Sequence, residues 1–297
     1  MKQRIITALI MAVVLVPLVI IGDIPFVILG MCAAYGAGYE LLNMFSVKHS
    51  ALKKYRFIFP LFNCLLVLTN YFVLEGELDL SFYLFMIIAT FICAMIICLK
   101  DSTLNMSAFG LFATVTVYSG IFISSLVSLR NVSSVAEVTD AKYMGAWLIV
   151  YLFASTMVTD IAAYFVGIKF GKKRLAPLIS PKKSVEGAIG GSVVGTICGT
   201  LVLIAIEKYY GVAFLKIDSQ VLNIIMIAVL SLAITIIGQI GDLVASKIKR
   251  EHDIKDYGNI FPGHGGVLDR FDSVIFVSLV TISIVLIINF FIGGTLW

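Results

Sequence analysis

The feature that most restricts how this chain can fold is a succession of long apolar runs joined by short polar connections. A helix that crosses a bilayer needs about 20 mostly apolar residues, and nine runs meet that need, within a chain of 297 residues that is 60% hydrophobic and 13% charged. The expected spans are Ile5–Ile21, Ile24–Phe45, Phe57–Val73, Leu80–Leu99, Ala108–Leu129, Met144–Ile168, Gly187–Tyr209, Val221–Ala245 and Val274–Ile292. The pattern predicts an all-α, polytopic integral membrane protein with about nine transmembrane helices, and it excludes an ordinary soluble domain.

The first run follows a charged N-terminus, as the apolar part of a secretory signal peptide does. No evident small-residue cleavage site follows it, and the next apolar run begins almost at once. We therefore expect Ile5–Ile21 to be retained as the first membrane helix.

Lysine and arginine are divided unequally between the two predicted sides of the membrane. When the connections are assigned to alternate sides, 18 of the 22 Lys and Arg residues share the side of the N-terminus. The other side holds only Arg130, Lys142, Lys208 and Lys216. Because positive residues concentrate in cytoplasmic loops, this asymmetry supports nine spans and predicts a cytoplasmic N-terminus.

The two halves of the chain differ in their chemistry. Residues 1–140 contain about five expected helices and no chemical motif, so we expect them to form a frame. Residues 141–297 contain the two largest cytoplasmic connections, 169–186 and 246–272, which carry most of the unusual polar residues. We therefore expect a C-terminal catalytic region that faces the cytoplasm.

The stretch Gly241–Ser273 has the densest polar chemistry in the chain. It contains six of the 18 acidic side chains, two of the three histidines and five Lys or Arg residues, with glycines among them. Carboxylates beside cations and exposed glycine amides can hold a divalent metal ion and phosphate groups together. Hard oxygen ligands favour magnesium over zinc.

Three carboxylates, Glu40, Asp160 and Asp242, fall inside expected spans, toward their cytoplasmic ends. A carboxylate at the bilayer centre costs at least about 2.5–3.5 kcal/mol, so such residues need a partner or a polar cavity. Together with Asp269 and Asp272 they predict one hydrophilic pocket that opens to the cytoplasm. The alternative is a set of separate acids at helix ends, which we favour only for Glu40 because nothing around it resembles a site.

Spacing places polar residues of the last two expected helices on common faces. The first set follows an i, i+4, i+7, i+11 pattern and consists of Asp242, Ser246, Lys249 and Asp253. This pattern is typical of one face of a helix that continues out of the membrane. Asp269 and Asp272 are three residues apart and share a face if the last helix begins there. Acids from two helices could then reach one cation.

The connection 169–186 carries cations at the expected start of the seventh span. Lys182, Lys183 and Ser184 follow Ser180-Pro181, and cations with a hydroxyl at a helix start predict an anion site. We interpret the cations at 172–174 as topology determinants that contact anionic lipid head groups.

Glycine recurs every four residues along the seventh span. The four positions are Gly187, Gly191, Gly195 and Gly199. Small residues at this spacing predict a face that packs closely against another membrane helix.

The run from Ser246 to Asp272 resembles the signature of phosphatidate cytidylyltransferases, also called CDP-diacylglycerol synthases. The matching residues are Ser246, Lys249-Arg250, Lys255-Asp256, Pro262, His264-Gly265-Gly266 and Asp269-Arg270-Phe271-Asp272. The segments DIAAYFVG (160–167) and SPKKSVEG (180–187) also resemble segments of the family. The first 140 or so residues are similar to it only in being hydrophobic.

The resemblance implies transfer of a cytidylyl group from CTP to phosphatidic acid, which gives CDP-diacylglycerol and pyrophosphate for phospholipid biosynthesis. The implied partners are CTP, phosphatidic acid and membrane lipids, with no nucleic acid, and the family suggests a homodimer in a bacterial plasma membrane. The lipid phosphate would attack the α-phosphorus of CTP, so Mg²⁺, alone or with a second cation, and Lys or Arg side chains must neutralise two polyanions.

Roles follow for individual residues from the resemblance and the polar pattern together. The expected catalytic residues are Asp242, Lys249, Arg250, Asp256, Asp269, Arg270 and Asp272. The expected substrate-binding residues are Lys182, Lys183, Ser184, Ser246, Lys255, His264, Gly265 and Gly266. The expected metal ligands are Asp242 and Asp269, followed by Asp272 and Asp160.

Two other classes of membrane protein also place acids in membrane helices. A transporter or channel predicts charges near the bilayer midplane and often an internal repeat, whereas here the charges gather at one face and the halves show no repeat. A CDP-alcohol phosphotransferase or a membrane prenyltransferase predicts DxxxD motifs, which this sequence lacks.

Overall fold

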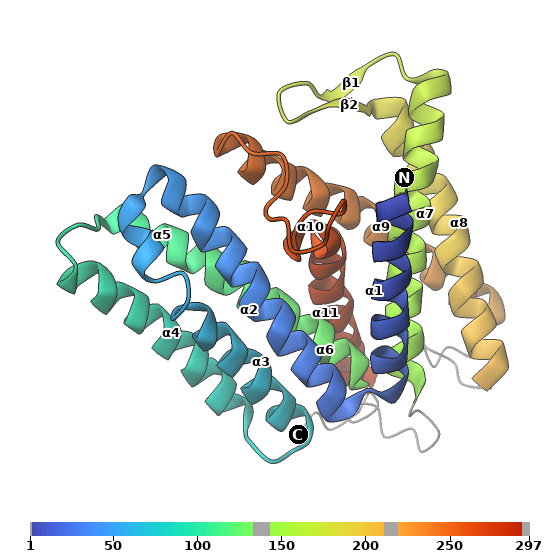
Figure 1. The fold of residues 1–297 in the computed structure, drawn as a ribbon. Helices are drawn as coiled ribbons and strands as arrows, with labels where there is room; N and C mark the ends of the chain where they lie inside the picture. The colour runs from blue at the N-terminus through green and yellow to red at the C-terminus, as the bar shows by residue number, and fades with distance from the viewer. Residues whose placement is uncertain (1, 133–142, 211–218, 293–297) are drawn as a thin grey trace. The chain divides into compact units, whose positions relative to one another are not determined.

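A computed structural model of the chain describes residues 2–132, 143–210 and 219–292 (Figure 1). Apart from one short hairpin and one isolated bridge, the regular structure of these residues is helical, which confirms the predicted all-α class. Two cations of the predicted charge asymmetry, Lys142 and Lys216, lie outside the described residues.

The described residues form long helices with a few short ones between them. Their bounds are α1 (Lys2–Ile21), α2 (Asp23–Lys48), η1 (Ser50–Lys54), α3 (Pro60–Leu74), α4 (Leu80–Lys100), α5 (Met106–Val115), η2 (Thr116–Ile121), α6 (Phe122–Arg130), α7 (Met144–Phe170), α8 (Val185–Tyr210), α9 (Gln220–Glu251), α10 (Leu268–Phe271) and α11 (Val274–Ile292). Helices α5, η2 and α6 form one continuous segment. Among the described residues, six helices are long and apolar enough to cross a membrane.

Three shorter apolar helices, Ile5–Ile21, Pro60–Leu74 and Val274–Ile287, accompany the six long ones. Each of the nine expected spans therefore corresponds to an apolar helix. The agreement arises because a run of apolar residues in lipid must satisfy its backbone hydrogen bonds internally, and a helix does so within one segment.

The chain forms two compact units. The first consists mainly of Met1–Ala146 and Glu251–Phe271, and the second of Trp147–Arg250 and Asp272–Thr295. We call Glu251–Phe271 the signature segment, because it holds most of the sequence signature. It packs in the first unit, although α9 before it and α11 after it belong to the second.

In the first unit, α3 packs against α2, α4 and the η2–α6 part of the long helix. Buried side-chain hydrogen bonds join α3 to that helix, from Asn63 to Ser119 at 2.8 Å and from Asn70 to Ser128 at 2.8 Å. A polar side chain surrounded by apolar groups needs a partner, so these pairs favour one register of α3.

In the second unit, α8 lies close to α7 through its glycines. A methyl group on Gly191 would lie 2.7 Å from the carbonyl oxygen of Thr159, and one on Gly199 would lie 2.7 Å from Ser155 Oγ. The absence of side chains at these positions therefore allows the two backbones to approach. The predicted close-packing face is confirmed.

Helix α9 continues past the expected end of its span to Glu251, so Asp242, Ser246 and Lys249 lie on one helix as predicted. The extension of this pattern to Asp253 is wrong. Asp253 lies beyond the helix with φ at 56°, a left-handed conformation that aspartate adopts more readily than most residues.

The last helix begins at Val274, the first residue of its expected span, so it includes neither Asp269 nor Asp272. Asp269 lies in the single turn of α10, and α11 begins only at Val274, after a turn that contains Asp272. The two aspartates therefore do not share the face of one helix.

Residues between α7 and α8 form a β-hairpin where we predicted a helix start (Figure 1). Strand β1 (Arg174–Ala176) pairs antiparallel with β2 (Ser180–Ser184), so Lys182 and Lys183 lie on a strand. The helix begins only at Val185. The Ser184 hydroxyl accepts the Gly187 N–H at 3.1 Å and so caps α8, which satisfies one of the free amides of its first turn.

Candidate active site

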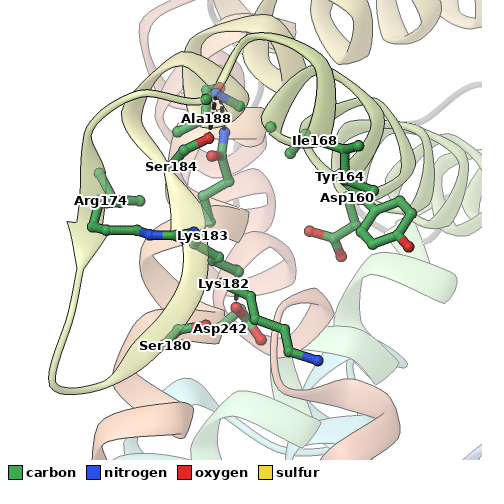
Figure 2. A pocket seen from close by; sticks show the side chains of 16 residues that line it. Asp160, Tyr164, Ile168, Arg174, Ser180, Lys182, Lys183, Ser184, Ala188 and Asp242 are labelled. Carbon is green, nitrogen blue, oxygen red and sulfur yellow. Dashed lines mark hydrogen bonds and ion pairs between the residues drawn. The ribbon is translucent and has the colours of Figure 1, made fainter.

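A cavity of about 710 Å³ in the second unit is lined by α7, the hairpin, α8 and α9. Its polar and charged lining residues are Asp160, Tyr164, Arg174, Ser180, Lys182, Lys183, Ser184, Gln239 and Asp242 (Figure 2). The volume lies within the roughly 300–1,000 Å³ of small-molecule sites. Lys183 of the hairpin and Asp242 of α9, which are about 60 residues apart in the sequence, both line this cavity.

The hairpin and α9 meet in this cavity through an ion pair. The Lys183 ammonium donates to Oδ2 of Asp242, and the two side chains are 31% and 23% exposed. Both charges can therefore be reached from the cavity. Asp160, on α7, interacts electrostatically with both of them, so two carboxylates and a cation from three elements face one space.

Backbone contacts at its base hold the hairpin in position. The Glu186 carboxylate, in the first turn of α8, accepts the Lys172 N–H at 3.0 Å and the Lys173 N–H at 3.2 Å. A methyl group on Gly167 of α7 would lie 3.0 Å from Ser184 Oγ, so glycine allows the end of β2 to approach α7. These contacts hold the hairpin against α7 and α8, and both lysines of β2 line the cavity.

Four polar lining residues were not predicted as site residues: Tyr164, Arg174, Ser180 and Gln239. Arg174 was interpreted as a topology determinant, although it lines the cavity. Gln239 also lines it and donates to Ser192 Oγ at 2.8 Å. An uncharged amide attracts little attention in a sequence, but a glutamine inside the apolar run of α9 was a signal that could have been used.

A second ion pair lies in the same unit. Lys249 Nζ is 3.7 Å from Asp272 Oδ2, and their side chains are only 10% and 15% exposed. Asp272 also accepts the backbone N–H of Ser273 at 2.9 Å. On the next residue of α9, Arg250 Nε donates to the Ile179 carbonyl oxygen of the hairpin at 3.4 Å.

The signature segment folds around two buried carboxylates in the first unit. Asp269 Oδ2 accepts the backbone N–H groups of Tyr257 at 2.7 Å and of Gly266 at 2.9 Å. The interpretation of Glu40 as an isolated helix-end acid is wrong, because this side chain is 2% exposed and bonds the same segment. A contact between residues 227 positions apart leaves no local signal in a sequence.

The other predicted residues of the signature segment have mixed environments. Lys255, Asp256 and Arg270 are exposed, whereas His264 is half-buried and its Nδ1 has no hydrogen-bond partner among the described residues. Gly265 has φ at +86°, which favours glycine. The structure thus groups Asp160 with Asp242 in the second unit and places Asp269 in the first.

Comparison with known proteins assigns the chain to a family. A family model described as the cytidylyltransferase family matches residues 2–288. The chain belongs to the cytidylyltransferase family. The resemblance found in the signature is therefore confirmed across nearly the whole chain rather than over the signature alone.

Individual relatives of this cytidylyltransferase agree with the family match. A phosphatidate cytidylyltransferase of Bacillus subtilis (strain 168) is 34% identical over 280 residues, which cover 93% of this chain and 94% of that protein. One from Staphylococcus saprophyticus is 29% identical over 93% of this chain and 96% of its own length. A third, from Haemophilus influenzae, is 37% identical over about half of each chain, 52% and 49%.

The carboxylates of this cytidylyltransferase can be compared with the needs of magnesium. Among the residues that the structure describes, no group of three or more His, Cys, Asp or Glu side chains could hold a metal ion by itself. Magnesium commonly uses one or two carboxylates and completes its shell with water and substrate phosphates. Asp160 and Asp242, which line the same cavity as three cationic side chains, fit that requirement.

Proposed function

We infer that this chain is a phosphatidate cytidylyltransferase, a multi-pass membrane enzyme that transfers the cytidylyl group of CTP to phosphatidic acid. The observation that carries the inference is 34% identity to a phosphatidate cytidylyltransferase over 93% of this chain. The cavity of the second unit supports it, since it combines carboxylates with cations as two phosphate substrates require.

The reaction exchanges one phosphate bond for another. An oxygen of the lipid phosphate forms a bond to the α-phosphorus of CTP, and the bond between that phosphorus and the oxygen bridging to the β-phosphate breaks. Pyrophosphate leaves with the electron pair. A phosphate oxygen is largely ionised at neutral pH, so the protein needs no base to activate it and must instead offset the repulsion of two polyanions.

Within the cavity, Arg174, Lys182 and Lys183 are proposed to hold phosphate oxygens, and Ser184 to donate a hydrogen bond. Lys183 is paired with Asp242 in the structure. When a triphosphate enters, the ammonium would exchange the carboxylate for a phosphate oxygen. Because both partners are charged, this exchange keeps Lys183 paired and releases Asp242.

Asp242 and Asp160 are then proposed as the carboxylates that hold magnesium. When bound, magnesium supplies Lewis-acid neutralisation of the reacting and leaving phosphates. A second cation, and metal binding by Asp269 and Asp272, stay predictions. Both of these aspartates already accept backbone N–H groups, which favours a role in positioning their own segments as well.

The remaining signature residues are proposed to act in the same reaction on the basis of the family resemblance. They are Ser246, Lys249, Arg250, Lys255, Asp256, His264, Gly265, Gly266 and Arg270. We further propose a cytoplasmic N-terminus, an active site that faces the cytoplasm, and a homodimer.

The test is transfer of label from CTP, carrying radioactive phosphorus at its α position, into organic-extractable lipid. Membranes containing this chain would be assayed with and without phosphatidic acid and with and without Mg²⁺. We expect label in lipid only when both are present. Asp242→Asn should lower the rate by about a hundredfold or more, the scale of losing a group that stabilises transition-state charge.

Asp253→Asn is the matched control, because Asp253 is an exposed aspartate of the same stretch that does not line the cavity. It should leave the rate unchanged. Absence of label with well-folded protein would reject the function, transfer without Mg²⁺ would reject the metal, and full activity of Asp242→Asn would reject the residue assignment.

A further inference from the structure

Glu40 is a buried carboxylate of α2 that the reaction scheme does not use. Its side chain is 2% exposed, so the energetic cost of burying it must be offset by strong hydrogen bonds. Oε1 accepts the backbone N–H of Val267 at 2.9 Å, and Oε2 accepts that of Leu268 at 3.0 Å. Both oxygens of the carboxylate are thus used on the signature segment.

Three consecutive amides of the signature segment are bound by two carboxylates. The Gly266 N–H goes to Asp269, and the next two N–H groups go to Glu40. Hydrogen bonds to an ionised acceptor are among the stronger ones in proteins. The backbone that leads from the His264-Gly265-Gly266 motif into α10 is therefore held from both sides.

Glycine at two positions of the segment is explained by the same carboxylate. A methyl group on Gly258 would lie 2.5 Å from Glu40 Oε1, and one on Gly266 would overlap the carboxylate as well. The segment wraps around the end of this side chain at two places. Side chains at these positions would push the backbone away from its acceptor.

Other residues of the N-terminal helices hold the segment beyond this point. Thr7 Oγ1 of α1 donates to the Pro262 carbonyl oxygen at 3.0 Å. The rings of Phe45 and His252 are 5.1 Å apart, and Lys48 donates to the carbonyl oxygen of Glu251. Helices α1 and α2 therefore contact the segment from its first residue to its last turn.

We propose that Glu40 is a positioning residue of the reaction, which fixes the backbone of the signature segment so that its polar groups are preorganised. The inference rests on the proposed function, because the signature residues must serve the reaction for their position to matter. It gives the N-terminal helices a part in catalysis beyond forming a frame. Catalytic groups displaced by about 1 Å can lose roughly a hundredfold in rate.

Substitutions of Glu40 distinguish its acceptors from its bulk. Glu40→Gln keeps the shape but offers one acceptor oxygen, and its NH₂ group faces the second amide. Glu40→Ala removes both acceptors. We expect kcat per folded molecule to fall about tenfold or more in Glu40→Gln and further in Glu40→Ala, with Glu40→Asp retaining part of the activity.

Leu41→Ala is the control for stability, since Leu41 is the next residue of α2, is 0% exposed and does not hydrogen-bond the segment. All variants are assayed at one temperature at which their folded fractions are equal. Thermal unfolding in detergent measures those fractions. Hydrogen–deuterium exchange would follow the amides of residues 266–268. We expect faster exchange there in the Glu40 variants and not in Leu41→Ala.

The two levels of inference fail separately. If the unsubstituted chain transfers no label to lipid, the proposed function is rejected. If it is active and the Glu40 variants match Leu41→Ala in kcat per folded molecule, the positioning role is rejected. Slower catalysis without faster exchange at residues 266–268 would also reject it, because the segment would then be unchanged.

Discussion

At the scale of single residues, the partner of a charge determines what it can do. Lys183 is paired with Asp242 inside a cavity, and both are partly exposed. A partly exposed ion pair contributes little to stability, so the pair has no strong structural reason to exist. The partial exposure of the pair therefore favours a lysine that can exchange its carboxylate partner for a phosphate over a lysine whose role is to stabilise the fold.

Replacing Lys183 by methionine should weaken CTP binding more than stability. Lys183→Met keeps most of the side-chain length but removes the cation. Loss of a hydrogen bond to a charged group costs about 1.5–3 kcal/mol, so KM for CTP should rise about 10- to 150-fold. Steady-state rates at varied CTP concentrations measure it.

Lys172→Met is the control for the loss of one positive charge from the same connection. Lys172 is exposed and does not line the cavity, so KM should stay unchanged. An equal rise of KM in both variants would show that the effect comes from overall charge rather than from the cavity.

Glu40 shows at the same scale why residue chemistry alone is insufficient. Hydropathy alone identifies this acid as unusual, because it lies inside an apolar run. Its partners are backbone amides 227 and 228 positions away. No property of the residues beside Glu40 carries information about them.

At the scale of elements, the α7–α8 pair depends on the small residues of α8. The carbonyl oxygen of Thr159 would lie 2.7 Å from a methyl group on Gly191. Backbone atoms cannot turn aside as a flexible side chain does, so any larger residue must separate the helices. The cavity is lined by both helices, and its shape depends on their distance.

Gly191→Ala should therefore destabilise the protein by about 1–3 kcal/mol, the usual cost of overpacking. Thermal unfolding in detergent, with the activity of the remaining folded protein, measures it. The same change at Gly110 of α5 is the control, because a methyl group there meets nothing within 4 Å. Gly110→Ala should be neutral or stabilising by up to about 1 kcal/mol. Equal melting temperatures for both variants would contradict the packing argument.

The hairpin between α7 and α8 is the element that the sequence predicted least well. Lys182, Lys183 and Ser184 have the composition of a helix start, and Ser184 does cap α8. The residues before it form β2 because Arg174–Ala176 are available to pair with them. Such pairing depends on the turn and on the partner strand, and a cap motif contains neither.

At the scale of the whole molecule, the distribution of Lys and Arg predicts how the chain crosses the membrane. The connection between α3 and α4 contains Glu77, and the hairpin tip contains Leu178, which is 94% exposed. The predicted topology places the first outside the cell and the second in the cytoplasm.

Single cysteines at these two positions test the topology. Labelling with a membrane-impermeant maleimide should modify Glu77→Cys in intact cells and Leu178→Cys only after permeabilisation. The chain's five cysteines lie in its helices, and the unsubstituted protein gives their background. The opposite pattern of labelling would overturn the cytoplasmic N-terminus.

Local sequence was sufficient to predict the class of the protein, its apolar helices and the close-packing glycines, and the resemblance of the signature to a known family indicated the family. Each of these depends on residues near one another in the chain: an apolar run, a four-residue repeat or a signature at fixed spacing. The bilayer strengthens the inference, because it leaves a backbone few ways to satisfy its hydrogen bonds.

Packing alone decided which polar groups meet. Lys183 pairs with Asp242 beside Asp160, and Lys249 pairs with Asp272. Glu40 is enclosed by the signature segment. These contacts join residues distant in sequence, and their formation depends on the helix ends, the hairpin and the turn before α11. A buried charge takes whichever partner the fold brings within hydrogen-bond distance, and that distance exists only in the folded chain.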